Sequence, residues 1–438
     1  MDKEVLTLIL ALSLIVSLLA GCGSAPAQQT QAPETTASAG NETAAPAENV
    51  EPQAVSLKVW SPSEDQNPDM GAWLNTMCEQ FNDLHPEWDI TFEYGVCTES
   101  EAKKLVPQDL DAAADVFIFS STGMENLNQA SCLAELGGKY LDAVKANYPE
   151  SLVKSVTYED GGVYGVPMTT NTYFMYYDKS VFTEEDVKSL DTMLEKGKVA
   201  YPLTDGFYNA AFYIGNGCTF FGEDGTDRAS GIQLGGEKGI AVTNALVDLV
   251  KNKNFIPAIP SDAIAMMREG NCNAYVCGTW QAAQTQEVLG DNFGVAMLPT
   301  FKVDGKDVQM RPFTSAKAIG VKATTAYPEV ALNLALYLGG YESQKAHYEM
   351  RGYIPCENQL ISEVQNDPIC RVDSQTIKEI AHPRSCFAEY SYFWTPAESM
   401  GTELRDGAVT HDNAAEKTEA FNVAANTSGL NYRDNLKK

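Results

Sequence analysis

Apolar residues recur at strand and helix spacings through most of the chain, and this pattern predicts a mixed α/β fold. Residues 56–60 alternate between polar and apolar side chains, and a second alternating segment covers 90–96. Apolar residues at helical spacing lie between them at 70–84, and a capping box at 98–101 opens another helix. The continuous apolar run at 116–119 is typical of a strand buried on both faces. This β-α-β-α-β order predicts a parallel sheet with helices packed on it.

The second half of the chain keeps this mixed character. Its patterns predict helices at 242–249, 262–269 and 328–338, a strand at 273–278, and a hairpin with an Asp-Gly turn at 301–308. Late in the chain, Thr395 and Glu398 form a capping box with Pro396 in the first helical position. A late helix is therefore expected to begin directly after Trp394.

Residues 1–21 have the pattern of a secretory signal peptide. An almost unbroken apolar run at 5–19 is too short to span a bilayer as a mature helix but has the length of a signal-peptide core. It ends in Leu19-Ala20-Gly21-Cys22, and small residues directly before a cysteine resemble the bacterial lipobox. Cleavage before Cys22 and attachment of a lipid to Cys22 are therefore expected. An ordinary cleaved signal or a membrane-anchored start is the alternative, because Lys3 alone supplies a positive n-region.

Residues 22–54 are rich in Ala, Pro, Thr, Gln, Glu and Ser and contain no aromatic residue. Such a segment buries too little apolar surface to offset its chain entropy, so a disordered, lipid-anchored linker is expected. A flexible chain of this length reaches on the order of 30 Å. No later stretch is long and apolar enough to span a membrane. A soluble body on the extracytoplasmic face of the cell membrane, tethered through the Cys22 lipid, is therefore predicted.

The formal net charge of −28 argues against nucleic acid as a partner, since phosphate binding needs clustered Lys and Arg. The same charge disfavours direct adsorption to an anionic lipid surface. It identifies no ligand, because net charge mainly affects solubility. Residues 55–438 are long enough for two domains or one large one, and their apolar content is that of a packed globular protein.

The cysteines besides Cys22 give neither a disulfide framework nor a metal site. They are Cys78, Cys97, Cys132, Cys218, Cys272, Cys277, Cys356, Cys370 and Cys386. An odd number cannot all pair within one chain, no C-x-x-C motif occurs, and the four histidines are scattered. Cys272 and Cys277 lie five apart on a predicted strand and face opposite sides, so no bond between them is expected. Most of these thiols are expected to be buried small apolar groups, and neither a metal nor a cofactor is predicted.

Several short motifs occur in an order that resembles one protein family. They are Leu57-Lys58-Val59-Trp60, the stretch 81–86 with its following strand, 114–119, 163–167, 174–179, 269–280 and 297–301. The chain resembles the extracellular solute-binding proteins of ABC importers, in the branch that includes the maltodextrin-binding proteins. The resemblance covers Val55 to about Tyr432.

The resemblance implies an α/β fold of the two-lobed, periplasmic-binding-protein-like type II, with discontinuous lobes joined by a hinge. It implies an N-lobe made of 55–168 and 298–340, and a C-lobe made of 169–297 and 341–438, the last including a C-terminal tail. Crossings between the lobes are expected near 167–171, 296–299 and 337–341. Ligand is expected outside the carboxyl ends of strands, as open α/β sheets generally require.

A saccharide site needs aromatic platforms for the apolar faces of sugar rings, and carboxylates, amides and hydroxyls for their rims. By correspondence with the family, the ligand-binding residues are Trp60, Asp65, Phe119, Thr122, Asn171, Asp205, Phe207, Tyr208, Trp280 and Trp394. Phe119 stands where maltodextrin-binding relatives place a tryptophan, and Thr122 and Asn171 stand at acidic positions. These departures argue against maltose itself and leave another saccharide open.

Each of these side chains also has a purely structural interpretation. Trp60 and Phe119 lie at strand ends, where they could belong to the core. Asp205 precedes a glycine and could be only a turn residue. Trp394 could be a hydrophobic staple ahead of its capping box. Trp280, between a Gly-Thr pair and a polar helix start, is the strongest candidate for ligand contact.

The resemblance implies a monomeric, non-enzymatic binding lipoprotein that captures a saccharide, in particular an oligosaccharide, and delivers it to ABC permease subunits. A glycan-active extracellular enzyme is one alternative, although G-x-S-x-G, H-E-x-x-H and the P-loop are absent and no carboxylate pair stands out. The same fold could bind a polyamine, a ferric ion or a peptide. The paired Tyr176-Tyr177 is similar to a feature of ferric-binding relatives, but the two tyrosines alternate along a strand and core packing is expected for both. A purely structural surface lipoprotein is the third alternative.

Overall fold

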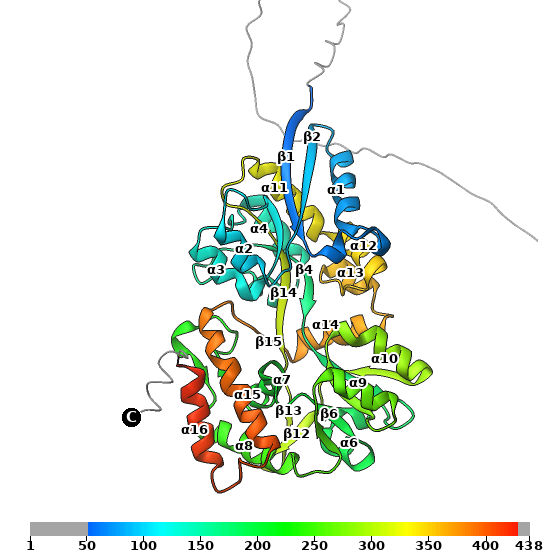
Figure 1. Ribbon diagram of the computed structural model, residues 1–438, viewed down its shortest axis with the longest axis vertical. Helices are drawn as coiled ribbons and strands as arrows, with labels where there is room; N and C mark the ends of the chain where they lie inside the picture. The colour runs from blue at the N-terminus through cyan, green and yellow to red at the C-terminus, as the bar shows by residue number, and fades with distance from the viewer. Residues whose placement is uncertain (1–50, 428–438) are drawn as a thin grey trace, which may run out of the picture. The chain divides into compact units, whose positions relative to one another are not determined.

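Two separate β-sheets, each covered by helices, organise the part of the chain that the computed structural model describes, residues 51–427 (Figure 1). The predicted signal peptide, the lipidation site Cys22 and nearly all of the predicted linker lie outside the described residues, as does the end of the C-terminal tail. Strand β1 begins at Gln53, so the last two residues of the predicted linker belong to the first sheet.

The first sheet has the strand order β15-β14-β3-β1-β2, with β4 paired to β14. Its strands are β1 (Gln53–Ser61), β2 (Trp88–Val96), β3 (Val116–Ser120), β4 (Val166–Asn171), β14 (Phe313–Val321) and β15 (His382–Pro383). Strand β1 is parallel to both β2 and β3, which confirms the parallel arrangement predicted from the first three strands. Strand β14 is antiparallel to β3 and to β4.

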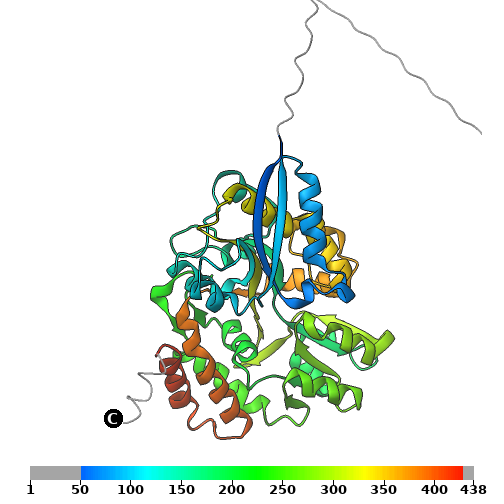
Figure 2. The same ribbon diagram turned by 45° about the horizontal axis from the view of Figure 1, so that its top comes forward.

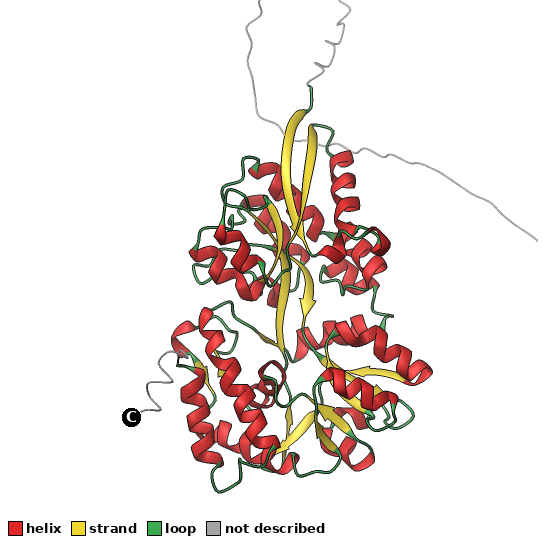
Figure 3. Cartoon of the chain, in the orientation of Figure 1, coloured by secondary structure: helices red, strands yellow, loops and turns green. Residues whose placement is uncertain are grey.

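Helices cover both faces of this sheet (Figure 3). They are α1 (Trp73–Leu84), α2 (Ala102–Gln108), α3 (Met124–Gln129), α4 (Gly138–Asn147), α5 (Glu150–Ser155), α11 (Pro328–Gly339), α12 (Tyr341–Arg351) and α13 (Asn358–Glu363). The core between helices and sheet contains the inward residues of the alternating strand β1, Leu57 and Val59, together with Phe81 of α1 and Val116 and Ile118 of β3. The sheet and these helices form the first lobe, except that β15 and the start of β14 pack on Phe220 of the second lobe.

The second sheet has the order β11-β5-β10-β6-β9. Its strands are β5 (Phe174–Asp178), β6 (Val199–Tyr201), β9 (Phe255–Pro257), β10 (Ala274–Cys277) and β11 (Phe293–Ala296). Strands β10, β6 and β9 are parallel, and β5 is antiparallel to β10 and β11.

The helices of the second lobe are α6 (Leu190–Lys196), α7 (Gly206–Gly215), α8 (Gly236–Leu249), α9 (Pro260–Arg268), α10 (Ala282–Leu289), α14 (Pro368–Glu379), α15 (Ser391–Arg405) and α16 (Ala414–Ala425). Helices α15 and α16 lie side by side in both views of the chain (Figures 1 and 2). A short ribbon of β7 (Thr219–Phe220) and β8 (Ile232–Gln233) completes the lobe.

The predicted hairpin is confirmed as β12 (Thr300–Val303) and β13 (Lys306–Gln309). Its two turn residues, Asp304 and Gly305, have φ angles of 50° and 75°. Positive φ at both central positions is the requirement of the turn that suits an antiparallel pair, which explains the Asp-Gly sequence. The hairpin packs on α6 and α8 and therefore lies with the second lobe.

The chain passes between the lobes at positions that differ from the expected ones. The first passage follows β4 and precedes β5, close to the predicted 167–171. The second follows the hairpin, later than the predicted 296–299, because β12 and β13 pack on second-lobe helices. The expected crossing at 337–341 does not occur there, since α11 and α12 both contact α1.

The indole of Trp73 in α1 explains why α12 stays with the first lobe. It is fully buried, donates to the Ser343 carbonyl at 2.8 Å, and stacks on His347 of α12 with ring centroids 4.2 Å apart. The third passage therefore follows α13, after which α14 contacts β5 and β11 of the second sheet. We place 341–363 in the first lobe rather than in the C-lobe.

Helix α15 begins at Ser391, and the expectation of a helix start after Trp394 is wrong. Pro396 lies inside the helix, and Thr395 is not its N-cap. Phe393 is fully buried on this helix, and Trp394 packs against the core. Burial of these rings stabilises the added first turn even though Pro396 cannot donate a backbone hydrogen bond.

The nine cysteines named above are all buried and free, so the expectation of buried thiols is confirmed. Tyr176 and Tyr177 of β5 are both buried as well, as predicted for core residues. Within residues 51–427, no helix has the length and apolar character needed to cross a membrane.

Candidate functional site

Several predicted ligand residues lie at the carboxyl ends of parallel strands in both sheets. Trp60 is the penultimate residue of β1, and Thr122 lies two residues after the end of β3, the parallel neighbour of β1. In the second sheet, Asp205 follows β6 and Trp280 follows β10, which is parallel to β6. Because the carboxyl ends of parallel strands meet at one edge of a sheet, each lobe presents one edge with candidate residues.

Strand β14 joins these two edges. Its first residue, Phe313, packs on Phe207 of the second lobe with ring centroids 6.3 Å apart. Four residues later, Lys317 pairs with Ser120 at the carboxyl end of β3 in the first lobe. Four residues of extended chain rise about 13 Å, so this stretch of β14 sets the separation of the two edges.

An aromatic cluster occupies the edge of the second lobe. It consists of Phe207, Phe313, Tyr390, Phe393 and Trp394, whose neighbouring rings have centroids 5.3 to 6.4 Å apart. Phe313, Tyr390 and Phe393 are fully buried, whereas Phe207 and Trp394 are half-buried. The structure thus brings together two predicted residues, Phe207 and Trp394, as the exposed members of one cluster.

The Arg384 guanidinium fixes the orientation of Trp394. Its carbon lies 4.6 Å from the centroid of the Trp394 ring and 5.4 Å from that of Tyr390. Burial lowers the pKa of Arg384 to about 10, so the group remains charged at neutral pH and attracts both rings. Gly206, at the start of α7, permits this packing, because a Cβ there would lie only 3.2 Å from the Trp394 ring.

Asp205 is the N-cap of α7 and accepts a hydrogen bond from the Phe207 backbone N–H at 2.8 Å. The turn interpretation is therefore correct, and the carboxylate also stands beside the aromatic cluster. Partial burial raises the pKa of Asp205, against the smaller lowering by that hydrogen bond. Tyr208, one residue further, is buried with its hydroxyl 4.0 Å from the Cys277 sulfur, and burial raises the pKa of Tyr208. Tyr208 therefore packs beneath this edge of the sheet and is not exposed on it.

Trp280 is the most exposed tryptophan of the predicted set, with 53% of its surface accessible. It lies in the short helical turn Thr279–Gln281 that follows β10. Its indole covers Gly278, where a Cβ would fall within 2.0 Å of the ring. A large ring that packs against a glycine and is open to solvent offers a stacking surface.

Trp60 is half-buried at the edge of the first lobe and covers Gly95 of β2 in the same way, since a Cβ there would lie 2.4 Å from the indole. The neighbouring polar candidates are engaged within the protein. The Thr122 hydroxyl lies 2.9 Å from that of Ser120, and the Asn171 amide donates to the Ser315 hydroxyl at 3.1 Å. Both remain partly exposed.

Phe119 is a core residue in this structure. Its side chain is fully buried and packs on Gly165 and Gly320, where a Cβ would meet the Phe119 ring at about 3 Å. The continuous apolar run of β3 explains this position, because both faces of the strand are covered. We therefore omit Phe119 from the proposed site.

Asp65 is buried in an ion-pair network of the first lobe. One carboxylate oxygen accepts from Arg351 at 2.7 Å and lies 2.9 Å from His347 Nε2. Burial lowers the pKa of His347, and the raising effect of Asp65 is smaller. The imidazole is therefore neutral at neutral pH, and Arg351 is the cation that balances the Asp65 carboxylate. The imidazole is stacked between Trp73 and Tyr353, with centroids 4.2 and 4.1 Å away. Asp65 thus positions Arg351 and the segment that follows α12.

That segment introduces residues that the sequence did not point to. Tyr353 lies under two cations, with Lys317 Nζ 5.1 Å and the Arg351 guanidinium carbon 5.2 Å from its ring centroid. Lys317 pairs with Glu99 at 2.5 Å. Burial lowers the pKa of Lys317, but the Glu99 carboxylate and Tyr353 together raise it by more, so the net pKa is raised. A lysine within the apolar strand β14 was the one sequence signal that could have drawn attention to this group.

The two lobes also touch through a buried carboxylate. Glu125 of α3 is fully buried and accepts hydrogen bonds from the guanidinium of Arg228 and the backbone N–H of Ala388, both in the second lobe. Arg228 also pairs with Glu159 at 3.2 Å and Glu389 at 3.4 Å. We call Glu125, Arg228 and Ala388 the interlobe latch.

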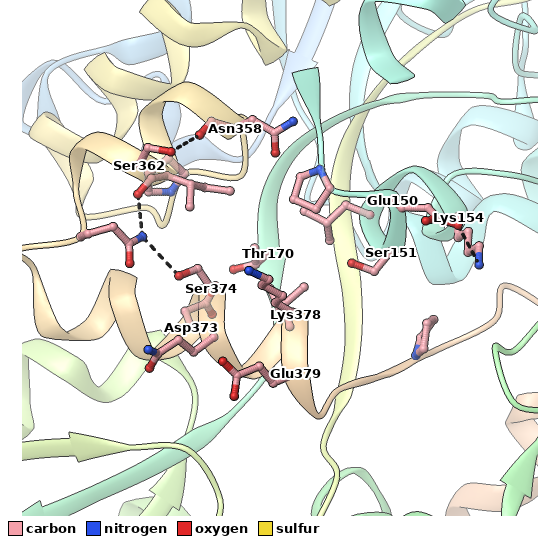
Figure 4. A pocket seen from close by; sticks show the side chains of 18 of the residues that line it. Glu150, Ser151, Lys154, Thr170, Asn358, Ser362, Asp373, Ser374, Lys378 and Glu379 are labelled. Atoms are coloured by element: carbon pink, nitrogen blue, oxygen red, sulfur yellow. Dashed lines mark hydrogen bonds and ion pairs between the residues drawn. The ribbon is translucent and has the colours of Figure 1, made fainter. Parts of the chain in front are cut away.

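A pocket of about 950 Å³ lies beside the hinge strands, β4 and β14, which connect the two lobes (Figure 4). Thr170 of β4 lines it, whereas none of the predicted ligand residues does. Successive residues of a strand point to opposite faces, so Thr170 and Asn171 face opposite sides of β4. The pocket, called here the hinge pocket, is therefore distinct from the edges that carry the aromatic residues.

Comparison with known families shows where this arrangement belongs. Residues 76–371 match the family model of bacterial extracellular solute-binding proteins. This match covers more than half of the chain, and the chain belongs to that family. A solved structure described as being with acarbose is 43% identical, with a TM-score of 0.76 and coverage of 85% of this chain and 98% of that one.

Further relatives agree with the fold. The maltodextrin-binding protein MalE1 from L. casei BL23, solved without ligand, has a TM-score of 0.78 at 24% identity over 85% of this chain and 99% of that chain. The galactooligosaccharide-binding protein of Bacillus subtilis (strain 168) is 26% identical, over 65% of this chain and 72% of its own length. A maltooligosaccharide ABC transporter solute-binding lipoprotein of Streptococcus pneumoniae is 24% identical, over 59% of this chain and 65% of its own length. The two-lobed fold implied by the sequence is confirmed.

Proposed function

We propose that this member of the bacterial extracellular solute-binding family captures an oligosaccharide between its two lobes. The observation that carries the proposal is the half-buried pair Phe207 and Trp394, with the Asp205 carboxylate beside it. Aromatic faces bind the C–H faces of sugar rings, and a carboxylate accepts from their hydroxyls. The relatives described as binding oligosaccharides support this ligand class.

The opposite edge supplies the complementary groups. Lys317, Glu99 and Tyr353 of the first lobe, together with Trp60, offer cationic, anionic and aromatic contacts. Trp280 offers a second stacking surface in the second lobe. A spacing of about 13 Å along β14 suits several sugar rings better than one. Lobe closure would then enclose the ligand, and the ligand would select the closed shape.

The proposal includes delivery of the saccharide to the permease of an ABC importer. It also includes anchoring through a lipid on Cys22, so that the receptor stays on the extracytoplasmic face near its transporter. The relative described as an ABC transporter lipoprotein supports both points. Incorporation of a clickable palmitate analogue into the wild-type chain, and its loss in Cys22→Ala, tests the anchor.

A thermal-shift screen followed by calorimetry tests the ligand class. The mature chain is titrated with maltotetraose, a galactooligosaccharide and acarbose, with spermidine and ferric citrate representing the other classes. A true ligand raises the unfolding midpoint in a concentration-dependent way by mass action. Binding of a polyamine or ferric complex at the aromatic edges, without any saccharide, would overturn the proposal.

The same samples address the enzymatic alternative. An end-labelled oligosaccharide recovered intact after prolonged incubation with the protein agrees with a binding role. Its cleavage by the wild-type chain would instead establish a glycan-active enzyme.

A further inference from the structure

The hinge pocket contains a carboxylate that the saccharide site does not use. Asp373 of α14 lines the pocket, is 1% exposed, and has no well-aligned hydrogen bond on either oxygen. The Thr170 hydroxyl, which lines the same pocket, is close enough to lower the pKa of Asp373 against the larger effect of burial, but it makes no well-aligned hydrogen bond to the carboxylate. Buried polar groups are nearly always satisfied, and an unpaired buried carboxylate is especially unfavourable. These atoms together call for a ligand that donates hydrogen bonds.

The remaining pocket residues narrow the class of that ligand. Lys154 is already paired with Glu150 at 3.2 Å and lies 3.9 Å from Asp224. Asp224, Asp373 and Glu379 then outnumber Lys378, the remaining cation that lines the pocket. The local charge therefore favours a cation.

The apolar part of the lining favours an aliphatic ligand. Leu152, Pro355, Ile361 and Ile377 line the pocket, and no aromatic residue does so. Without an aromatic platform, the pocket lacks the main contact that a sugar ring uses. Methylene groups suit these aliphatic side chains, and Figure 4 shows the carboxylates on the same helix, α14.

We propose that the hinge pocket binds a small linear aliphatic diamine. One ammonium group donates to the Asp373 carboxylate and the Thr170 hydroxyl, and the second is attracted by Glu379. The methylene chain lies against the aliphatic lining. A volume of about 950 Å³ leaves ample room for such a ligand together with water.

The protonation state of Asp373 is consistent with this ligand. Burial raises the pKa of Asp373 to about 7. The carboxylate is therefore available above that pH, and an ammonium group beside it would favour ionisation further. The other charged groups around the pocket are Lys378, Glu379, Glu150, Asp224 and the paired Lys154.

Calorimetric titration of the mature chain at pH 8 with 1,5-diaminopentane tests the proposal. The neutral 1,5-pentanediol, of equal length, serves as the control ligand. We expect saturable one-site binding of the diamine and none of the diol. In Asp373→Asn the affinity should fall at least about tenfold, because the charged acceptor is lost. The exposed Asp142→Asn removes the same charge from α4 and should bind as the wild type does.

Three results would overturn the proposal. If the diamine does not bind at millimolar concentration, the hinge pocket is not a diamine site. Equal weakening in both variants would show general attraction to a chain of net charge −28. Binding of a saccharide that depends on Asp373 but not on Trp394 would assign the pocket to another ligand class.

Discussion

Trp280 is the residue at which stacking on the ligand can be measured with the least disturbance of the fold. Its ring is 53% exposed, so truncation removes little core packing. We expect Trp280→Ala to weaken saccharide binding at least about tenfold, in line with the roughly 1–3 kcal/mol of aromatic stacking and burial. Calorimetry on the wild type and variant measures the change.

Trp88→Ala is the matched control for this experiment. Trp88 is half-buried, stacks on His85 at 4.7 Å, and begins β2, at the opposite end of the strand from Val96. Its loss should leave the affinity for saccharide unchanged. An unchanged affinity in Trp280→Ala as well would remove Trp280 from the site.

Asp65 illustrates a residue whose role is mainly one of position. Replacing it with Ala leaves Arg351 without its carboxylate in a buried setting. Breaking a buried ion pair by removing one partner costs about 3–5 kcal/mol of unfolding free energy. Urea denaturation should show this loss for Asp65→Ala and almost none for the exposed neighbour Asp69→Ala. A similar stability of the two variants would show that the network contributes little.

Asp373 predicts a specific dependence of stability on pH. Its folded pKa of about 7 lies above the ordinary value of 3.8, so the folded chain binds this proton more tightly than the unfolded chain. Its contribution to stability is therefore highest below about pH 4, falls as pH rises towards 7, and is constant above. The neighbouring Cys356 and Cys370 thiols have pKa values raised by burial, and they stay neutral through this range.

Asp373→Asn removes this titration. We expect the variant to gain on the order of 4 kcal/mol over the wild type at pH 8 and little at pH 4, because the pKa shift from 3.8 to about 7 corresponds to about 1.4 kcal/mol per pKa unit. Denaturation curves of both proteins across this pH range give the difference between their unfolding free energies. The contributions of the other titrating groups are the same in both proteins and cancel in this difference. A difference that does not vary with pH would contradict the assignment.

At the residue scale, the sequence indicated which residues lie near the proposed ligand site better than it indicated what each residue does there. Trp280, Phe207 and Trp394 could be nominated because the order of motifs resembles that of a known family, whose ligand-binding positions they match. The network of Asp65 could not, because its partner Arg351 lies 286 positions away and only folding brings them together. Phe119 was misplaced for the converse reason, since a strand end does not reveal whether helices cover it.

At the scale of elements, α15 offers a direct test of where the helix begins. Pro396 lies inside the helix, where it cannot donate to the Tyr392 carbonyl. If Pro396 were the first helical residue, as the capping box suggested, its replacement would be neutral or harmful. In the observed helix, Pro396→Ala should raise the unfolding free energy by about 1–3 kcal/mol. Chemical denaturation distinguishes the two cases.

Local chemistry explains which elements were predictable. The Asp-Gly turn, the Pro start of α11 and the alternation of β1 are each set by neighbouring residues, and the structure confirms all three. The start of α15 depends on the burial of Phe393 against Phe220 and Phe313, which are distant in sequence. Tertiary packing there outweighs the capping box.

At the scale of the whole described molecule, the resemblance to a known family supplied what periodicity could not. No local pattern shows that α12 belongs with α1 or that the hairpin belongs with α6. These placements rest on contacts such as the Trp73 indole with the Ser343 carbonyl. The passages between lobes were accordingly the least accurate part of the expected organisation.

The interlobe latch gives a prediction for the balance between open and closed forms. Arg228→Ala leaves the buried Glu125 carboxylate without its cation, and separation of the lobes would return that carboxylate to water. We expect the ligand-free variant to be more open, with a larger radius of gyration in small-angle scattering. Saccharide should bind it more weakly, because a smaller fraction of molecules is ready to close.

The exposed pair of Arg405 with Asp406 lies within one lobe and supplies the control, Arg405→Ala. This variant should match the wild type in both scattering and affinity. Glu125→Gln adds a second check, since it removes the buried charge but keeps an acceptor for the Ala388 N–H. Its radius of gyration should lie nearer to the wild type than that of Arg228→Ala. If Arg228→Ala scatters as the wild type does, the latch does not set the lobe equilibrium, and the hinge strands β4 and β14 must set it alone.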